Sequence, residues 1–153
     1  MDEAVARSLA RWPNVPAVYG WLELDRRGSW RIKGDRISNV ALREFIARNY
    51  AADERGCWYF QNGPQRVYVA LAYTPFVVHY EGERLFDHCG NPADALETWL
   101  DDEGSVLIRT TQGIALLDDR DLNRYADSGH QLPGIRKSEV ASRFGFHPEP
   151  QKT

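Results

Sequence analysis

Short stretches of alternating apolar and polar side chains recur along the chain, and such alternation predicts β-strands with one buried face. The clearest example is Ser29–Lys33, in which Trp30 and Ile32 alternate with polar neighbours. A second strand is predicted over Ala17–Asp25, and the turn signal Arg26-Arg27-Gly28 lies between the two. Together these segments predict a β-hairpin.

Three more strand pairs are predicted, each joined by a short turn of polar residues or glycine. In one of these strands Val67 and Val69 face one way, whereas Arg66 and Tyr68 face the other. The pairs are Cys57–Gln61 with Gln65–Tyr73, Phe76–Tyr80 with Arg84–His88, and Ser105–Thr110 with Gly113–Leu117.

Apolar residues at helical spacing predict helices between these strands. The first helix ends before Pro13, because proline disfavours a continuing helix. Ser38 and Ser138 have hydroxyl groups that suit helix N-caps, and Pro92 suits a first helical turn. The predicted helices are Asp2–Arg11, Ser38 to about Tyr50, Pro92–Leu100, Asp121–Ala126 and Ser138–Phe144.

This order of elements predicts an α+β protein with antiparallel sheet and helices on one face. We interpret it as two hairpin-helix-hairpin units, over residues 17–75 and 76–127. A helix and linker (1–16) precede them, and a short helix and tail (128–153) follow, of which His147–Thr153 is expected to fray. One continuous antiparallel sheet with two inserted helices is the alternative.

Composition narrows the possible functions. The chain has 153 residues and a formal net charge of −3, which does not favour a nucleic-acid partner. No apolar stretch approaches the ~20 residues that span a bilayer, and the acidic start Met1-Asp2-Glu3 is unlike a secretory signal, so we expect a cytoplasmic protein with no membrane partner. Aromatic residues make up 12% of the chain, and several lie on predicted buried faces: Trp30, Phe45, Tyr59 and Trp99.

The histidines and cysteines provide the main candidates for catalysis. His79, His88 and Cys89 fall on one predicted hairpin, and zinc accepts such ligands. No motif with metal-ligand spacing accompanies them, and adjacent residues of a strand point to opposite faces, which separates His88 from Cys89. We therefore expect no metal, no cofactor and no catalytic residue. A hydrolase-like or metal-dependent enzyme that uses these three side chains is the alternative.

The second strand pair offers a candidate binding surface. Gln65 and Arg66 follow the turn Asn62-Gly63-Pro64, and they supply an amide and a planar guanidinium. Trp21, Trp58 and Tyr68 lie on neighbouring predicted strands. These five residues predict a surface that binds a small anionic ligand or a peptide. A hairpin turn whose arginine stacks on aromatic rings is the competing interpretation, and a self-associating scaffold is a third possibility.

One segment resembles a known family. Gly28–Ile37 has the pattern G-x-W-x-x-x-G-x-x-I, and Thr74-Pro75-Phe76-Val77-Val78 follows after a helix and a strand pair. This pattern, within Gly20–Val78, resembles a family of small uncharacterised bacterial proteins that contain a domain of unknown function. The resemblance implies repeated α+β motifs and a role in ligand sensing or signalling, with no assigned activity. It transfers no site residue.

Overall fold

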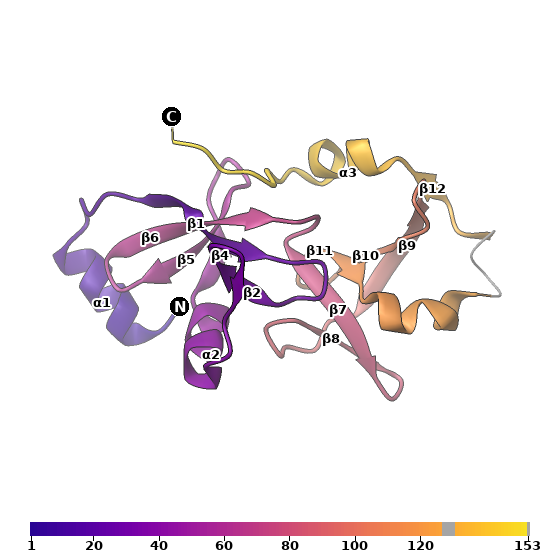
Figure 1. Ribbon diagram of the computed structural model, residues 1–153, viewed down its shortest axis with the longest axis horizontal. Helices are drawn as coiled ribbons and strands as arrows, with labels where there is room; N and C mark the ends of the chain where they lie inside the picture. Colours follow the sequence, from indigo (N-terminus) through magenta and orange to yellow (C-terminus); the bar gives the residue numbers. More distant parts are fainter. Residues whose placement is uncertain (127–130, 153) are drawn as a thin grey trace. The chain divides into compact units, whose positions relative to one another are not determined.

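The computed structural model describes residues 1–126 and 131–152 and shows an α+β protein (Figure 1). Its helices are α1 (Glu3–Arg11), α2 (Val40–Arg48), the 3-10 helix η1 (Asp119–Tyr125) and α3 (Lys137–Phe144). The chain forms two compact units. The first unit contains residues 1–25, 29–72 and 146–153, and the second contains residues 26–28 and 73–145.

The sheet of the first unit has six strands in the order β3-β2-β1-β6-β5-β4. The central strands β1 and β6 run parallel, and the other neighbours are antiparallel. The register of β1 on β6 shifts between Val18 and Leu22, where Gly20 adopts a φ of 77°. The strands are β1 (Val18–Leu24), β2 (Trp30–Ile32), β3 (Asp35–Arg36), β4 (Tyr50–Ala52), β5 (Trp58–Asn62) and β6 (Gln65–Leu71).

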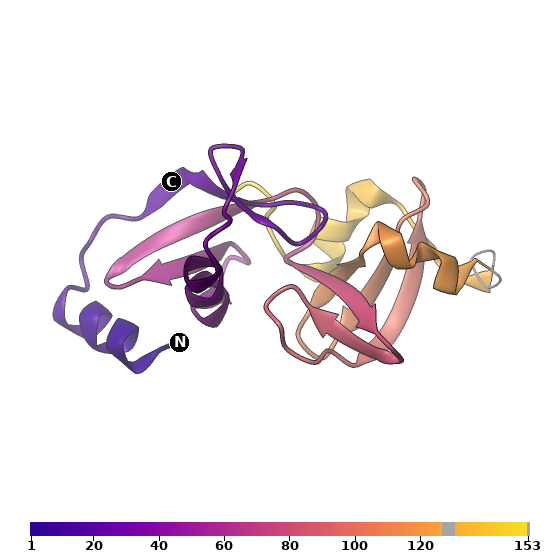
Figure 2. The ribbon, with the colours of Figure 1, turned by 60° about the horizontal axis from the view of Figure 1, so that its bottom comes forward.

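Helix α2 lies beside this sheet in both ribbon views (Figures 1 and 2). Ile46 of α2 is buried, and Phe45 meets Phe60 of β5 edge to face, with ring centroids 5.5 Å apart. The predicted N-cap was wrong by one residue: Asn39, not Ser38, caps the helix, because its Oδ1 accepts a hydrogen bond from the Leu42 amide at 2.9 Å.

The sheet of the second unit also has six strands, in the order β12-β9-β10-β11-β7-β8. Its centre is densely packed: Leu107, Ile108 and Ala115 are fully buried. Trp99 packs on Phe144 of α3 with ring centroids 5.2 Å apart. The strands are β7 (Phe76–Glu81), β8 (Arg84–Asp87), β9 (Ala95–Asp101), β10 (Val106–Thr110), β11 (Ile114–Leu117) and β12 (Gly134–Ile135).

The two sheets share a strand order. In each, a hairpin (β1-β2 or β7-β8) is followed by three antiparallel strands (β4-β5-β6 or β9-β10-β11). The last strand of the three then pairs in parallel with the first strand of the hairpin. Both sheets are therefore mixed, and the prediction of purely antiparallel sheet was wrong. The parallel pairs join strands far apart in the sequence, which local alternation does not reveal.

The predicted second hairpin-helix-hairpin unit lacks its central helix. The segment predicted as the helix Pro92–Leu100 forms strand β9 instead. Burial alternates there, with Trp99 and Asp101 buried and Leu96 exposed, so the helical spacing of its apolar residues was misleading. Hydrogen bonds to the neighbouring strand β10 override that local preference.

Two further corrections concern the C-terminal part. Helix α3 begins at Lys137, whose amide donates to Oδ1 of Asp102 at 2.8 Å, so Asp102 and not Ser138 satisfies its first turn. The tail was expected to fray, yet the His147 amide donates to the Gly56 carbonyl at 3.0 Å, and the Leu71 amide donates to the Pro148 carbonyl at 2.7 Å. Residues 147 and 148 thus lie within the first unit.

Four turns share the sequence Asp-x-x-Gly and the same geometry. In each, Oδ1 of the aspartate accepts a hydrogen bond from the amide four residues later, at 2.8–3.0 Å. The glycine has a positive φ of 80–87°, a conformation that other residues rarely adopt. The turns are Asp25–Gly28, Asp53–Gly56, Asp87–Gly90 and Asp101–Gly104.

Candidate functional site

The two faces of strand β6 divide the predicted binding residues. Gln65 and Val67 point to the face that α2 covers, whereas Arg66 and Tyr68 alternate to the opposite face. Trp21 of β1 lies on the same side as Gln65. The structure therefore divides four of the five predicted residues into two separate groups, Trp21 with Gln65 and Arg66 with Tyr68.

The first group lines a pocket of about 420 Å³ between α2 and the sheet. We call it the apolar pocket. Its wall contains no residue with an ionisable side chain, and its polar members are the amides Asn62 and Gln65. Among the described residues neither amide side chain has a hydrogen-bond partner. The lining residues are Val18, Trp21, Leu22, Ile32, Leu42, Ile46, Phe60, Asn62, Gln65 and Val67.

Three apolar side chains of this wall are unusually exposed. Trp21 is 50% exposed, Ile32 39% and Leu42 38%. The Nζ atom of Lys33 lies 4.2 Å from the centroid of the Trp21 ring, which places one positive charge beside the exposed indole. Apolar surface that converges on a concave space while still in water is typical of a ligand site.

The second group forms a cluster on the opposite face, made of Tyr19, Tyr59, Tyr68, Asp53, Arg55 and Arg66, which we call the tyrosine–arginine cluster. The ring of Tyr19 stacks on that of Tyr68 at 4.7 Å, and Tyr59 meets Tyr68 at 5.9 Å. The guanidinium carbon of Arg66 lies 3.9 Å from the Tyr59 ring centroid.

One carboxylate organises this cluster. Oδ2 of Asp53 accepts a hydrogen bond from the Tyr68 hydroxyl at 2.8 Å, and its Oδ1 accepts from the amides of Arg55 and Cys57. Burial by itself raises the pKa of Asp53, but these hydrogen bonds outweigh it and hold that pKa below its ordinary value. Burial also raises the pKa of Tyr68, so its hydroxyl stays protonated and able to donate.

Trp58 belongs to neither group. Its ring packs on Tyr50 with centroids 4.8 Å apart, and Tyr50 in turn meets Trp30 at 5.0 Å. Trp30 is on β2 and Tyr50 on β4, four places apart in the strand order, so this contact shows that the sheet curves. Trp58 thus supports the curvature of the sheet.

The candidates for catalysis are placed differently from the prediction. Strand β8 ends at Asp87, so His88 and Cys89 fall in a turn, and Nε2 of His88 lies 3.7 Å from Sγ of Cys89. The prediction that these neighbours point apart was wrong. Burial raises the pKa of Cys89, which keeps the thiol protonated and poorly nucleophilic. His79 contacts Glu81 at 3.7 Å, and no group of three or more metal-binding side chains occurs among the described residues.

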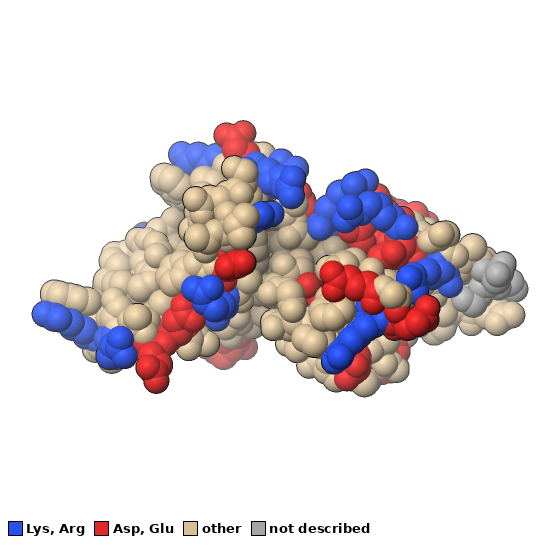
Figure 3. All heavy atoms as spheres, turned by 90° about the horizontal axis from the view of Figure 1, so that it is seen from below, with Lys and Arg blue, Asp and Glu red and all other residues tan. Residues whose placement is uncertain are grey.

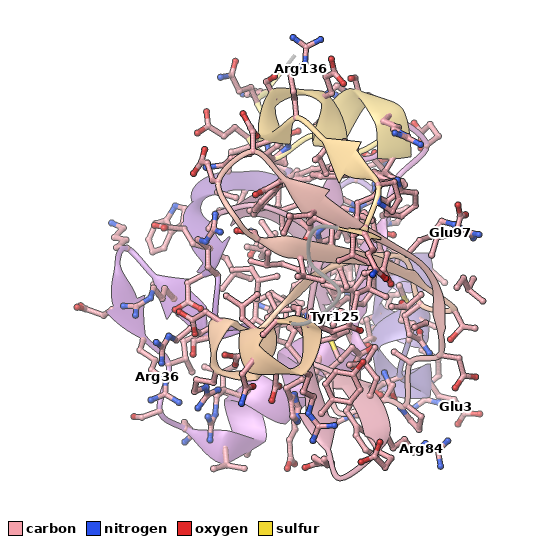
Figure 4. The ribbon with its side chains drawn as sticks, turned by 90° about the vertical axis from the view of Figure 1, so that its right-hand side faces the viewer. Glu3, Arg36, Arg84, Glu97, Tyr125 and Arg136 are labelled. Carbon is pink, nitrogen blue, oxygen red and sulfur yellow. The ribbon has the colours of Figure 1, made fainter. Side chains whose placement is uncertain are left out.

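The second unit has a larger cavity, of about 510 Å³, with a charged lining. The charged side chains of this lining already have partners: Arg136 pairs with Glu139 at 2.6 Å, and Asp101 accepts a hydrogen bond from Tyr73 at 2.8 Å. Figure 4 shows Arg136 pointing outward. The lining is Leu100, Asp101, Asp102, Leu132, Gly134, Ile135, Arg136 and Glu139.

Surface charge does not gather by sign on the face drawn in Figure 3, where basic and acidic side chains are interspersed. This agrees with the small net charge of −3. Within the described residues no helix is long and apolar enough to cross a membrane.

The fold is similar to that of two solved structures of DUF1285 family proteins. A DUF1285 family protein from Silicibacter pomeroyi DSS-3 is 19% identical, with a TM-score of 0.57 over 83% of this chain and 78% of that chain. A DUF1285 family protein from Shewanella baltica OS155 is 14% identical, with a TM-score of 0.53 over 69% of this chain and 90% of that chain.

The chain itself belongs to the family described as a protein of unknown function (DUF2946), whose model matches residues 1–151. The predicted resemblance to an uncharacterised family is therefore confirmed, and it extends over nearly the whole chain. No curated protein matches the chain.

Proposed function

We propose that this protein is a non-enzymatic binding or regulatory module, and that the apolar pocket of the first unit holds its ligand. The observation that carries the proposal is the half-exposed Trp21 on the wall of a 420 Å³ pocket. Pockets for small molecules commonly have about 300–1,000 Å³ and apolar walls with a few polar groups.

The lining determines the class of ligand. Apolar walls favour a ring or a short branched chain, whose burial removes the exposed faces of Trp21, Ile32 and Leu42 from water. The amides of Asn62 and Gln65 offer both donors and acceptors to a single polar group of the ligand. General acid–base catalysis needs a titratable group beside the substrate, and this lining has none, which favours binding over catalysis.

A neutral fluorescent probe tests whether the pocket binds apolar molecules. N-phenyl-1-naphthylamine is uncharged and becomes fluorescent in apolar surroundings. We expect saturable fluorescence with the wild-type protein, and about tenfold weaker binding by Leu42→Glu, because a carboxylate then lies on the pocket wall. Leu96→Glu is the matched control, since Leu96 is also an exposed leucine but lies in the second unit.

A panel of metabolites and short peptides then identifies the natural ligand class by competition with the probe and by a rise in Tm. Quenching of tryptophan fluorescence that is lost in Trp21→Phe assigns binding to this pocket. Equal probe binding by the two leucine variants contradicts the proposal, as does a panel in which no compound displaces the probe or raises Tm.

A further inference from the structure

Arg66 is the least satisfied cation of the tyrosine–arginine cluster. Its guanidinium has five N–H donors, but its one hydrogen bond among the described residues is to the Tyr68 hydroxyl, at 3.5 Å. No ion pair among those residues includes it. Its flat face lies on the ring of Tyr59, 3.9 Å away, which leaves the donor-bearing edge of the guanidinium available.

Arg55 directs a second guanidinium to the same point. Its Nη2 lies 3.4 Å from the Tyr68 hydroxyl, so two positive groups converge on one oxygen atom. The carboxylate nearby, Asp53, already accepts hydrogen bonds from two amides, the Tyr68 hydroxyl and Arg55. The cluster therefore holds two positive charges and one negative charge. The carboxylate of Asp53 is already hydrogen-bonded within the turn and to the Tyr68 hydroxyl.

This arrangement resembles an anion site more than a stabilising network. Two like charges that share an acceptor repel each other, whereas an oxyanion between them accepts hydrogen bonds from both. The stacked Tyr19 and Tyr68 rings hold the Tyr68 hydroxyl in place. Arg55 also lines a cavity of about 210 Å³ with Cys57, His147 and Glu149, which leaves space for the organic part of a ligand.

We propose that Arg55 and Arg66 form a second binding site, on the face of the sheet opposite the apolar pocket, and that it binds the phosphate group of a phosphorylated small molecule. A planar guanidinium matches two phosphate oxygens at once, and the cluster has one positive charge in excess to attract an anion. This site is independent of the apolar pocket, because alternate residues of β6 serve the two faces.

The test is a titration of ¹⁵N-labelled protein with inorganic phosphate at constant ionic strength, with chloride as the exchanged anion. We expect saturable shifts of the arginine Nε–Hε resonances of Arg55 and Arg66. Arg66→Gln weakens phosphate binding about tenfold or more, and Arg66→Lys weakens it less, because lysine keeps the charge but loses the planar pair of donors. Glu149→Gln strengthens binding, since it removes a negative charge that lines the same cavity as Arg55.

Arg36→Gln is the matched control. Arg36 is an exposed arginine of β3 in the same unit, and Figure 4 shows it pointing outward. Shifts that grow linearly without saturation overturn the proposal, and so do shifts that survive in Arg66→Gln or vanish equally in Arg36→Gln. The wild-type titration decides the matter even if Arg66→Gln does not fold. Binding of the neutral naphthylamine probe is unaffected in either case, so failure here is distinct from failure of the apolar pocket.

Discussion

The two units have the same strand order but differ in the connection between their hairpin and the following three strands. In the first unit that connection contains β3 and α2, and the apolar pocket forms where the helix meets the sheet. In the second unit the connection from β8 to β9 contains no helix, and the apolar side chains of the central strands β10 and β11 are buried. The comparison indicates that the inserted helix, not the shared sheet, creates the candidate binding site.

The largest expected effect is on the free energy of unfolding, and it distinguishes the core of the second unit from that of the first. Leu107→Ala in β10 leaves a cavity in dense packing and should lower the free energy of unfolding by about 3–5 kcal/mol. Ile46→Ala in α2 should cost about 2 kcal/mol, because Ile46 already borders the apolar pocket and its loss enlarges an existing space. Urea denaturation measures both. Equal losses would show that the helix packs on its sheet as tightly as the second core.

The second-largest expected effect compares two Asp-x-x-Gly turns at equivalent places in the two sheets: Asp53–Gly56 between β4 and β5, and Asp101–Gly104 between β9 and β10. Asp101→Ala removes the acceptor of two amides and leaves the buried Tyr73 hydroxyl without its partner, so we expect a loss of about 2–4 kcal/mol. Asp53→Ala should cost less, because the Tyr68 oxygen still accepts hydrogen bonds from Arg55 and Arg66 after its O–H loses the Asp53 acceptor. Thermal and urea unfolding test the order of the two variants.

A third prediction contrasts two aspartates of the Asp-x-x-Gly turns by their response to pH. The pKa of Asp53 is lowered in the folded protein, so its stabilisation is complete above the ordinary value of 3.8 and is lost as the pH falls through the lower folded value. Burial raises the pKa of Asp87, whose Oδ2 is buried without a partner. Its contribution is therefore present below 3.8 and is lost as the pH rises through the folded value.

Substitution by asparagine should therefore have opposite effects at the two positions. At neutral pH Asp87→Asn should stabilise the protein by about 1 kcal/mol, because it removes a buried charge and keeps an acceptor for the turn amides. Asp53→Asn should destabilise it at neutral pH and change little in acid. Unfolding free energies between about pH 3 and pH 7 decide the question; destabilisation by Asp87→Asn at neutral pH would show that its carboxylate is satisfied.

The smallest expected effect concerns the wall of the apolar pocket. Trp21→Phe should change the free energy of unfolding by about 0.5 kcal/mol or less, because half of this side chain is already in water. The same variant should lose ligand-dependent quenching. A large loss of stability would assign Trp21 to the core of the first unit and weaken its role in binding.

Much of the fold follows from local patterns. Alternation of apolar residues located β1, β2, β5, β6, β7, β8, β10 and β11, and Trp30, Tyr59 and Trp99 are buried as predicted. The parallel pairing of β1 with β6 and of β7 with β11 was missed, because it depends on contacts between distant segments. The Asp-x-x-Gly repeat was visible in the sequence, and its aspartates and glycines could have placed four turns.

The sequence analysis grouped Gln65 and Arg66 into one surface. The structure places Gln65 on the wall of the apolar pocket and Arg66 in the tyrosine–arginine cluster, and the alternation along β6 already implied two surfaces because adjacent strand residues point to opposite faces. Asp53, Arg55 and Tyr19 were not singled out, because the turn and the curved sheet that bring them to Tyr68 arise only after folding. Leu42 was not singled out either, and its exposure depends on the space left beside α2.

The return of residues 146–148 to the first unit has a consequence for how the protein is made. The backbone bonds from Leu71 to Pro148 and from His147 to Gly56 await residues that leave the ribosome only after 73–145 have been synthesised. The first unit therefore cannot complete its native backbone hydrogen bonding until these C-terminal residues have been synthesised. The first unit is thus the first to be synthesised but is completed only by the last residues of the chain. A fragment that ends at residue 72 therefore lacks part of the first unit.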